Sequence, residues 1–221
     1  MIRLGKIGAR LLSPLPYDAK VEYLDSTGTQ WIDTLVNADS NLSVEITMAN
    51  VGTPWTNVNP TGTIRSSPRC RHHLNFGAYD VVYYFGVGDS CNLRSHVKPS
   101  DGEIFTFKVD AISKTFTLGS LLGNFPNDTF DTGLSYWLFG RNSTTPPYLG
   151  SLRTYSAKLW DGSTLVRDFI PVRFTNENGV SEGAMYDRRG IGGMNPDGSA
   201  RNDGLYRNRG TGVFVIGPDK N

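Results

Sequence analysis

The sequence is poor in the residues from which most reactive sites are built: its 221 residues include 2 cysteines and 3 histidines. Neither set has the ligand spacing of a structural zinc site, and no Gly-X-Ser-X-Gly nucleophile elbow is present. Cys70 and Cys91 either pair in an oxidising compartment or remain free thiols in a reducing one. His72 and His73 follow two arginines, whose charges lower imidazole basicity. We expect this histidine pair in a solvated turn and predict no nucleophilic catalysis.

The sequence also lacks an excess of charge and a long apolar run. Its 22 basic and 21 acidic residues leave a formal charge of +1, so electrostatics favour neither nucleic acid nor an anionic membrane as a partner. No segment approaches the roughly 18 apolar residues of a membrane span. At the N-terminus glycine, lysine and arginine interrupt the apolar residues, so a secretory signal is not expected.

Paired carboxylates are missing as well. A glycoside hydrolase needs two acids that face each other across a cleft, whereas the clearest strand pattern, 42–48, offers Glu45 alone. The sequence therefore predicts a non-enzymatic protein with no cofactor. Calcium is the one ion left open, because hard cations bind in oxygen-rich loops. The calcium candidates are Asp128 with Asp131, and Asp197 with Asn202 and Asp203, and solvated turn carboxylates are the alternative.

Glycine and proline are plentiful, with 25 and 12 residues spread along the chain, which is typical of many short strands joined by turns. Residues 42–48 and 105–109 alternate apolar with polar side chains, as half-buried strands do. Residues 51–68 are rich in Gly, Pro, Thr and Asn. We predict a long connection there, with a short strand over 62–65 as the alternative.

The segment 151–173 predicts a central hairpin. Asp161-Gly162 is a strong turn signal. The strand that follows has apolar side chains on both faces, which indicates the middle of a packed structure. Pro171 is expected at an edge, a bulge or the end of the strand, because it cannot donate a ladder hydrogen bond.

Charged residues within this hairpin are expected to be structural. Asp168 shares a face with Val166 and Ile170, and a buried carboxylate needs a cationic partner. Arg153 and Arg173 are the candidate partners. The residues assigned a structural role are Arg153, Arg167, Asp168 and Arg173.

Four segments together resemble one family: 21–34 (VEYLDSTGTQWIDT), 138–142 (LFGRN), the hairpin 155–173, and 210–214 (GTGVF). In this order they resemble the concanavalin A-like (LamG-like, or laminin-G-like) jelly-roll domains of phage virion and tail proteins and of gut bacterial surface proteins. The resemblance implies an all-β, antiparallel β-sandwich of jelly-roll type over residues 21–221. Residues 188–203 depart from the pattern and are interpreted as an exposed loop insertion.

Residues 1–20 precede the resemblance and form an N-terminal extension. This apolar and basic arm either adds a strand to its own domain or docks on a neighbouring subunit.

The resemblance implies assembly or adhesion rather than catalysis. The expected protein is a bacteriophage virion structural protein (capsid decoration, head fibre or tail-associated) that is made in the host cytoplasm. It would contact other virion proteins through its arm, with homo-oligomers left open, and display a lectin-like domain for glycan or host-surface adhesion. The alternative is a carbohydrate-binding module on a bacterial cell surface. Aromatic residues in turn-rich stretches would contact the sugar, with edge-of-core packing as the alternative: Trp55, Tyr79, Tyr148 and Trp160.

Overall fold

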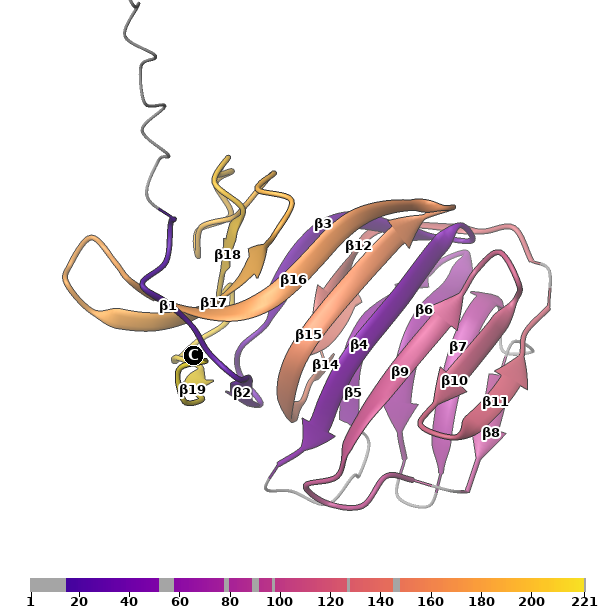
Figure 1. The fold of residues 1–221 in the computed structure, drawn as a ribbon. Helices are drawn as coiled ribbons and strands as arrows, with labels where there is room; N and C mark the ends of the chain where they lie inside the picture. The colour runs from indigo at the N-terminus through magenta and orange to yellow at the C-terminus, as the bar shows by residue number, and fades with distance from the viewer. Residues whose placement is uncertain are drawn as a thin grey trace, which may run out of the picture.

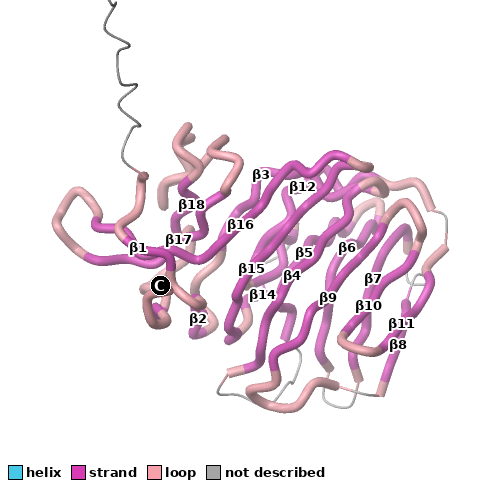
Figure 2. Tube along the Cα trace, viewed as in Figure 1, coloured by secondary structure: helices cyan, strands magenta, loops and turns pink. Residues whose placement is uncertain are grey.

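A computed structural model describes residues 15–51, 58–77, 80–88, 92–96, 98–126, 128–144 and 148–220. Two β-sheets pack face to face around one main core, and none of the described residues is helical (Figures 1 and 2). The expected all-β sandwich is therefore confirmed. No helix suited to crossing a membrane occurs within these ranges.

The first sheet carries the central hairpin and runs across the front of Figure 1. Its strand order is β11 (Leu121–Asn124), β10 (Thr115–Leu118), β9 (Ile104–Asp110), β4 (Leu42–Asn50), β15 (Ser151–Asp161), β16 (Thr164–Thr175), β17 (Ser181–Asp187) and β18 (Leu205–Arg207). Three short strands join this sheet at its side: β1 (Ala19–Lys20), β2 (Leu24–Thr27) and β19 (Val215–Ile216).

The second sheet lies behind the first. Its strands are β14 (Tyr148–Leu149), β13 (Gly140–Ser143), β5 (Val58–Ser66), β6 (Arg69–Phe76), β7 (Val81–Val87) and β8 (Asn92–Ser95), with β12 (Asp131–Leu138) and β3 (Ile32–Asp39) attached through β5. One pair, β5 with β13, is parallel, and the other described pairs are antiparallel. The chain reverses between β12 and β13 at Phe139, whose φ is 66°, so the sheet is not wholly antiparallel.

The main core confirms the alternation read from the sequence. Val44, Ile46 and Met48 of β4 are buried, while Glu45 and Thr47 between them are partly exposed. Aromatic rings fill the space between the sheets, as in the edge-to-face pair Phe85 and Phe130, with centroids 4.8 Å apart. Each fully buried side chain of this size contributes about 1.5–3 kcal/mol to folding.

Strand β16 is apolar on both faces, as expected. Phe169 belongs to the main core, whereas Val172 and Phe174 pack in a second, smaller cluster with Ala184 and Leu205. Pro171 occupies none of the three positions expected for it. On one side of β16 the pairing with β15 ends at Phe169, and the pairing with β1 begins at Val172. Pro171 lies between these two ladders, so its missing N–H removes no ladder hydrogen bond on that side.

A β-bulge alters the predicted faces of β16. Leu159 pairs with Arg167 and Trp160 pairs with Leu165, which leaves Val166 without a partner in β15. The extra residue re-aims the side chains around it. Val166 therefore packs against the main core, and it does not share a cluster with Ile170.

The expected long connection over 51–68 is wrong from Val58 onward. Strand β5 spans nine residues there and is buried from Val58 to Thr63. Its threonines suit a strand although they are polar, and Thr61 Oγ1 donates to the Trp137 carbonyl at 2.7 Å. At Gly62 a Cβ would lie 2.3 Å from His73 Cβ, so glycine lets β5 approach β6.

The two segments expected to deviate from the family pattern are partly described. In the arm, Ala19 and Lys20 form β1 against β16, while residues 1–14 lie outside the described ranges. The predicted insertion 188–203 is mostly exposed and irregular, but Met194 is buried in the main core and forms bridges to Ala200 and Tyr206.

Candidate functional site

Two cavities flank the β15–β16 turn at one end of the sandwich. Each has a volume of about 270 Å³. The outer cavity is lined by Ser43, Lys108, Val109, Asp110, Ile112, Trp160, Gly162 and Ser163. The inner cavity is lined by Leu35, Val36, Asn37, Asp39, Leu42, Asp161, Val166 and Arg167. Consecutive residues of the same segments line the two cavities, so only the backbone of two chain segments separates them.

The outer cavity is built around Trp160, which precedes Asp161, the last residue of β15. Trp160 pairs with Ser43 on one side and with Leu165 on the other, and its side chain is half-buried. Together with the exposed Ile112 it supplies an apolar wall. A half-buried indole in a cavity wall offers a flat surface that costs little conformational entropy on binding.

Polar groups surround this wall. Lys108 is half-exposed and its Nζ lies 3.9 Å from Glu45 Oε2. Ser43 Oγ accepts a hydrogen bond from Ala111 N at 2.9 Å, which leaves its own hydroxyl hydrogen to donate. Hydrogen bonds from Ser113 and Ile112 lower the pKa of Asp110, so this carboxylate is an acceptor at neutral pH. The outer cavity thus combines an aromatic surface with donors and acceptors.

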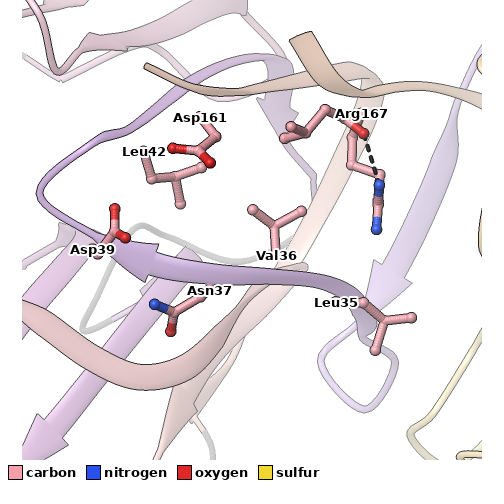
Figure 3. Close-up of a pocket in the computed structure, with 8 residues that line it drawn as sticks. Leu35, Val36, Asn37, Asp39, Leu42, Asp161 and Arg167 are labelled. Carbon is pink, nitrogen blue, oxygen red and sulfur yellow. Dashed lines mark hydrogen bonds between the residues drawn. The ribbon is translucent and has the colours of Figure 1, made fainter. Parts of the chain in front are cut away.

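The inner cavity opens between the two sheets. In Figure 3, Val36, Leu42, Asp39 and Asp161 surround a common space, while the guanidinium of Arg167 lies apart at the opposite end. Val36 and Val166 pack against the main core. Asp39 Oδ1 accepts the N–H of Asn41 at 2.8 Å. The cavity therefore joins an apolar wall to two carboxylates.

Arg167 lies at one end of the inner cavity, and hydrogen bonds within the chain fix its guanidinium. Its Nε donates to the Thr34 carbonyl at 3.0 Å and its Nη1 donates to the Val166 carbonyl at 2.7 Å. The buried carboxylate of Asp187 lies 3.9 Å from Arg167 Nε and accepts the N–H groups of Asp168 and Arg189. The guanidinium of Arg167 is thus held by contacts within the chain and also lines the cavity.

The other charged residues of the hairpin have partners that differ from those expected. Asp168 pairs with Arg188 at 2.6 Å, so neither of its two candidate partners is correct. Arg153 instead holds Asp25 through two hydrogen bonds of 2.7 and 2.8 Å, and Arg173 pairs with Asp219 at 2.8 Å. The sequence placed Arg188 in a loop insertion, and nothing in the local pattern indicated that this loop returns to β16.

Of the four aromatic residues proposed as sugar contacts, Trp160 is the one whose surroundings the structure describes. Trp55 and Tyr79 lie outside the described residues. The backbone of Tyr148 pairs with Arg141 in the second sheet, but its side chain is not described. Sequence reasoning missed the polar partners of Trp160 because they come from β4 and β9, which only the sheet order brings beside β15.

The calcium candidates are engaged in contacts within the chain. Asp131 accepts hydrogen bonds from Asn37 and Gly133, which lower its pKa. Hydrogen bonds from Ser199 lower the pKa of Asp197 in the same way.

Asp203 pairs with Arg201. Burial acts to raise its pKa, but hydrogen bonds from Arg201 and Leu205 lower it overall. Asp128 Oδ2 lies 3.4 Å from Val87 N. Among the described residues, no three His, Cys, Asp or Glu side chains gather closely enough to hold a metal ion.

The histidine pair is not in a solvated turn, and that expectation is corrected. His72 and His73 lie in β6 and are 0% and 1% exposed. His72 Nε2 lies 2.9 Å from the Leu42 carbonyl and its Nδ1 lies 3.2 Å from Tyr83 Oη. Burial lowers the pKa of His72 to about 4.

His73 stacks on Tyr84 with centroids 4.7 Å apart. Its Nε2 lies 3.3 Å from Arg141 Nη1, and because arginine can only donate, this nitrogen accepts and the ring is neutral. Burial, and then the positive charges of Arg141 and Arg71, hold the pKa of His73 well below its usual range. The histidines are therefore packed into the second sheet and do not form part of the two cavities.

Compared with known proteins, the sequence matches no family model and no curated protein.

Proposed function

We propose that this protein is a non-enzymatic binding domain that is displayed on the surface of a phage particle. Its outer cavity binds a saccharide. One observation carries the proposal: half-buried Trp160 forms one wall of an open cavity whose rim supplies Lys108, Asp110 and Ser43. Sugars present apolar C–H faces and hydroxyl edges, so they need an aromatic surface with donors and acceptors around it.

The position of this cavity suits display. Along β16, the residue opposite Trp160 is Leu165 and the residue opposite Lys20 of β1 is Val172. Seven residues of strand separate these points, which is about 23 Å. An arm that leaves the domain at β1 can therefore attach to another virion protein without covering the cavity.

The assignment to a virion rests on the resemblance to concanavalin A-like jelly-roll domains, which is an argument by fold analogy. The arm residues Ile2, Leu4 and Ile7 are apolar and are proposed to make the contact with neighbouring virion proteins. Replacing all three by serine in the full chain is expected to abolish incorporation into particles. Incorporation at the normal level, measured by mass spectrometry of purified particles, would remove the anchoring role.

Binding to a glycan array tests the saccharide proposal directly. The full chain is expected to bind a defined set of glycans, and Trp160→Ala is expected to weaken that binding at least tenfold, about 1.4 kcal/mol. Tyr155→Ala is the matched control, because it removes a half-buried ring from the same strand about 17 Å from the cavity. No glycan binding by the wild type, or equal losses in both variants, would reject the proposal.

A further inference from the structure

The two cavities adjoin at the β15–β16 turn, and this arrangement bears on the size of the ligand. Trp160 and Gly162 line the outer cavity, while Asp161 between them lines the inner one. The same division occurs on β4, where Leu42 faces the inner cavity and Ser43 the outer. The Gly162 N–H donates to the Asn41 carbonyl at 3.1 Å and fixes the two segments side by side. A ligand longer than one sugar ring in the outer cavity would meet the inner cavity next.

Gly162 lines the outer cavity and directly follows Asp161, which lines the inner one. Its φ is 54°, and a Cβ placed there would meet no atom within 4 Å. The space into which a side chain at this position would project is therefore open.

The inner cavity differs chemically from the outer one. It has no aromatic ring among its lining residues, and four of them are aliphatic: Leu35, Val36, Leu42 and Val166. Figure 3 shows Val36 and Leu42 near the carboxylates of Asp39 and Asp161. A sugar hydroxyl satisfies the carboxylates and leaves the aliphatic wall without an apolar partner. An acetamido group satisfies both, because its N–H donates to a carboxylate while its methyl group is buried against valine and leucine.

We infer that the two cavities are adjoining subsites for one oligosaccharide, which crosses the turn at Gly162 and places an N-acetylhexosamine unit in the inner cavity. This inference rests on the proposed saccharide-binding function. The outer subsite stacks one ring on Trp160, and the inner subsite selects the acetamido group. The β-bulge at Val166 contributes directly, because it turns an aliphatic side chain into the inner cavity.

Matched sugars test the inner subsite. Calorimetry with the full chain compares N-acetylglucosamine, its β-1,4 disaccharide and trisaccharide, and the corresponding glucose series, which differ only in the acetamido group. We expect the acetylated disaccharide to bind at least tenfold more tightly than both the monosaccharide and cellobiose. Asp161→Asn should remove about tenfold of this preference and leave the affinity for cellobiose unchanged.

Asparagine at the turn tests the crossing. Asn tolerates positive φ, so Gly162→Asn should fold and fill the space between the cavities. It is expected to lower disaccharide affinity to the monosaccharide level while monosaccharide affinity stays the same. Gly179→Asn is the control, because Gly179 also has positive φ and open surroundings but lies in the β16–β17 turn.

Several results would overturn the inference. They are equal affinity for the acetylated and glucose series, tightest binding of the free-amine disaccharide, and disaccharide affinity unaffected by Gly162→Asn. Failure of all these sugars to bind would also overturn it. A glycan array that is positive only for glycans without N-acetylhexosamine would overturn the inference and leave the proposed function standing, whereas a blank array would reject both.

Discussion

The end of the β15–β16 hairpin and the middle of β6 both place polar side chains beside aromatic rings, with opposite consequences. Around Trp160, the side chains of Lys108 and Asp110 are at least partly exposed and border a cavity. In β6, His72 and His73 are buried beside Tyr83 and Tyr84. A polar group that is sealed inside a sandwich needs a partner within the fold, whereas one at an open rim remains able to bind a ligand. Polar side chains beside aromatic rings are therefore part of the packed interior in β6, and they line an open cavity at the hairpin end.

Two glycines give the strongest test of this difference. Gly62→Ala places a Cβ within 2.3 Å of His73 Cβ and 2.4 Å of the His72 carbonyl oxygen, so we expect a loss of about 3 kcal/mol in unfolding free energy. Gly162→Ala meets open space and should lose about 1 kcal/mol through its positive φ. Chemical denaturation measures both. Equal losses would contradict the view that β6 is closed and the turn open.

The dependence of stability on pH separates the two regions next. The folded-state pKa of His72 is about 4, whereas an unfolded histidine has a pKa of about 6.5. Between these values the unfolded chain binds more protons, so stability is greatest above pH 6.5 and falls as pH drops toward 4. The slope is up to about 1.4 kcal/mol per pH unit for each such histidine.

Replacement of His72 by Gln should reduce this slope, measured by denaturant titration between pH 4.5 and 7. His96→Gln provides the control for the loss of a histidine side chain, because His96 is exposed. An unchanged slope in His72→Gln would show that another group titrates.

The smallest expected effect concerns Asp168, whose carboxylate pairs with half-exposed Arg188. Asp168→Ala should lower unfolding free energy by about 1 kcal/mol, since ion pairs with an exposed partner contribute little. Saccharide affinity should not change, because Asp168 lines neither cavity. Arg188→Ala should cost a similar amount. Unaltered melting with lost binding would move Asp168 from a structural to a binding role.

The secondary structure was predictable from the sequence where one face of a strand is buried and the other is exposed to solvent. The alternation of β4 and the glycine in the hairpin turn are local signals. The loop is Gly162-Ser163, one residue later than the predicted Asp161-Gly162, because Asp161 still pairs with Thr164. Prediction failed in the first part of β5 and in the first part of β6, where threonine, asparagine, arginine and histidine are buried by neighbours distant in sequence. The alternative strand over 62–65 falls within β5. No local pattern distinguishes a buried polar strand from a loop.

The candidate site was predictable only in part, for the same reason. The sequence identifies Trp160 as a candidate because it is an aromatic residue beside a turn. Its polar neighbours Lys108 and Asp110 come from β9. The inner cavity includes Val166, which lies at a β-bulge that has no local sequence signal. Residues that are brought together by sheet order and register can be identified only from the assembled sheet.

Strand β16 belongs to both hydrophobic clusters, because Phe169 packs in one and Val172 in the other. The smaller cluster, which is built from β16, β17 and β18, therefore shares the continuous backbone of β16 with the sandwich. Heat should therefore unfold both clusters in one cooperative transition. A substitution that destabilises the small cluster should lower the melting temperature of the whole domain, including the distant hairpin tip.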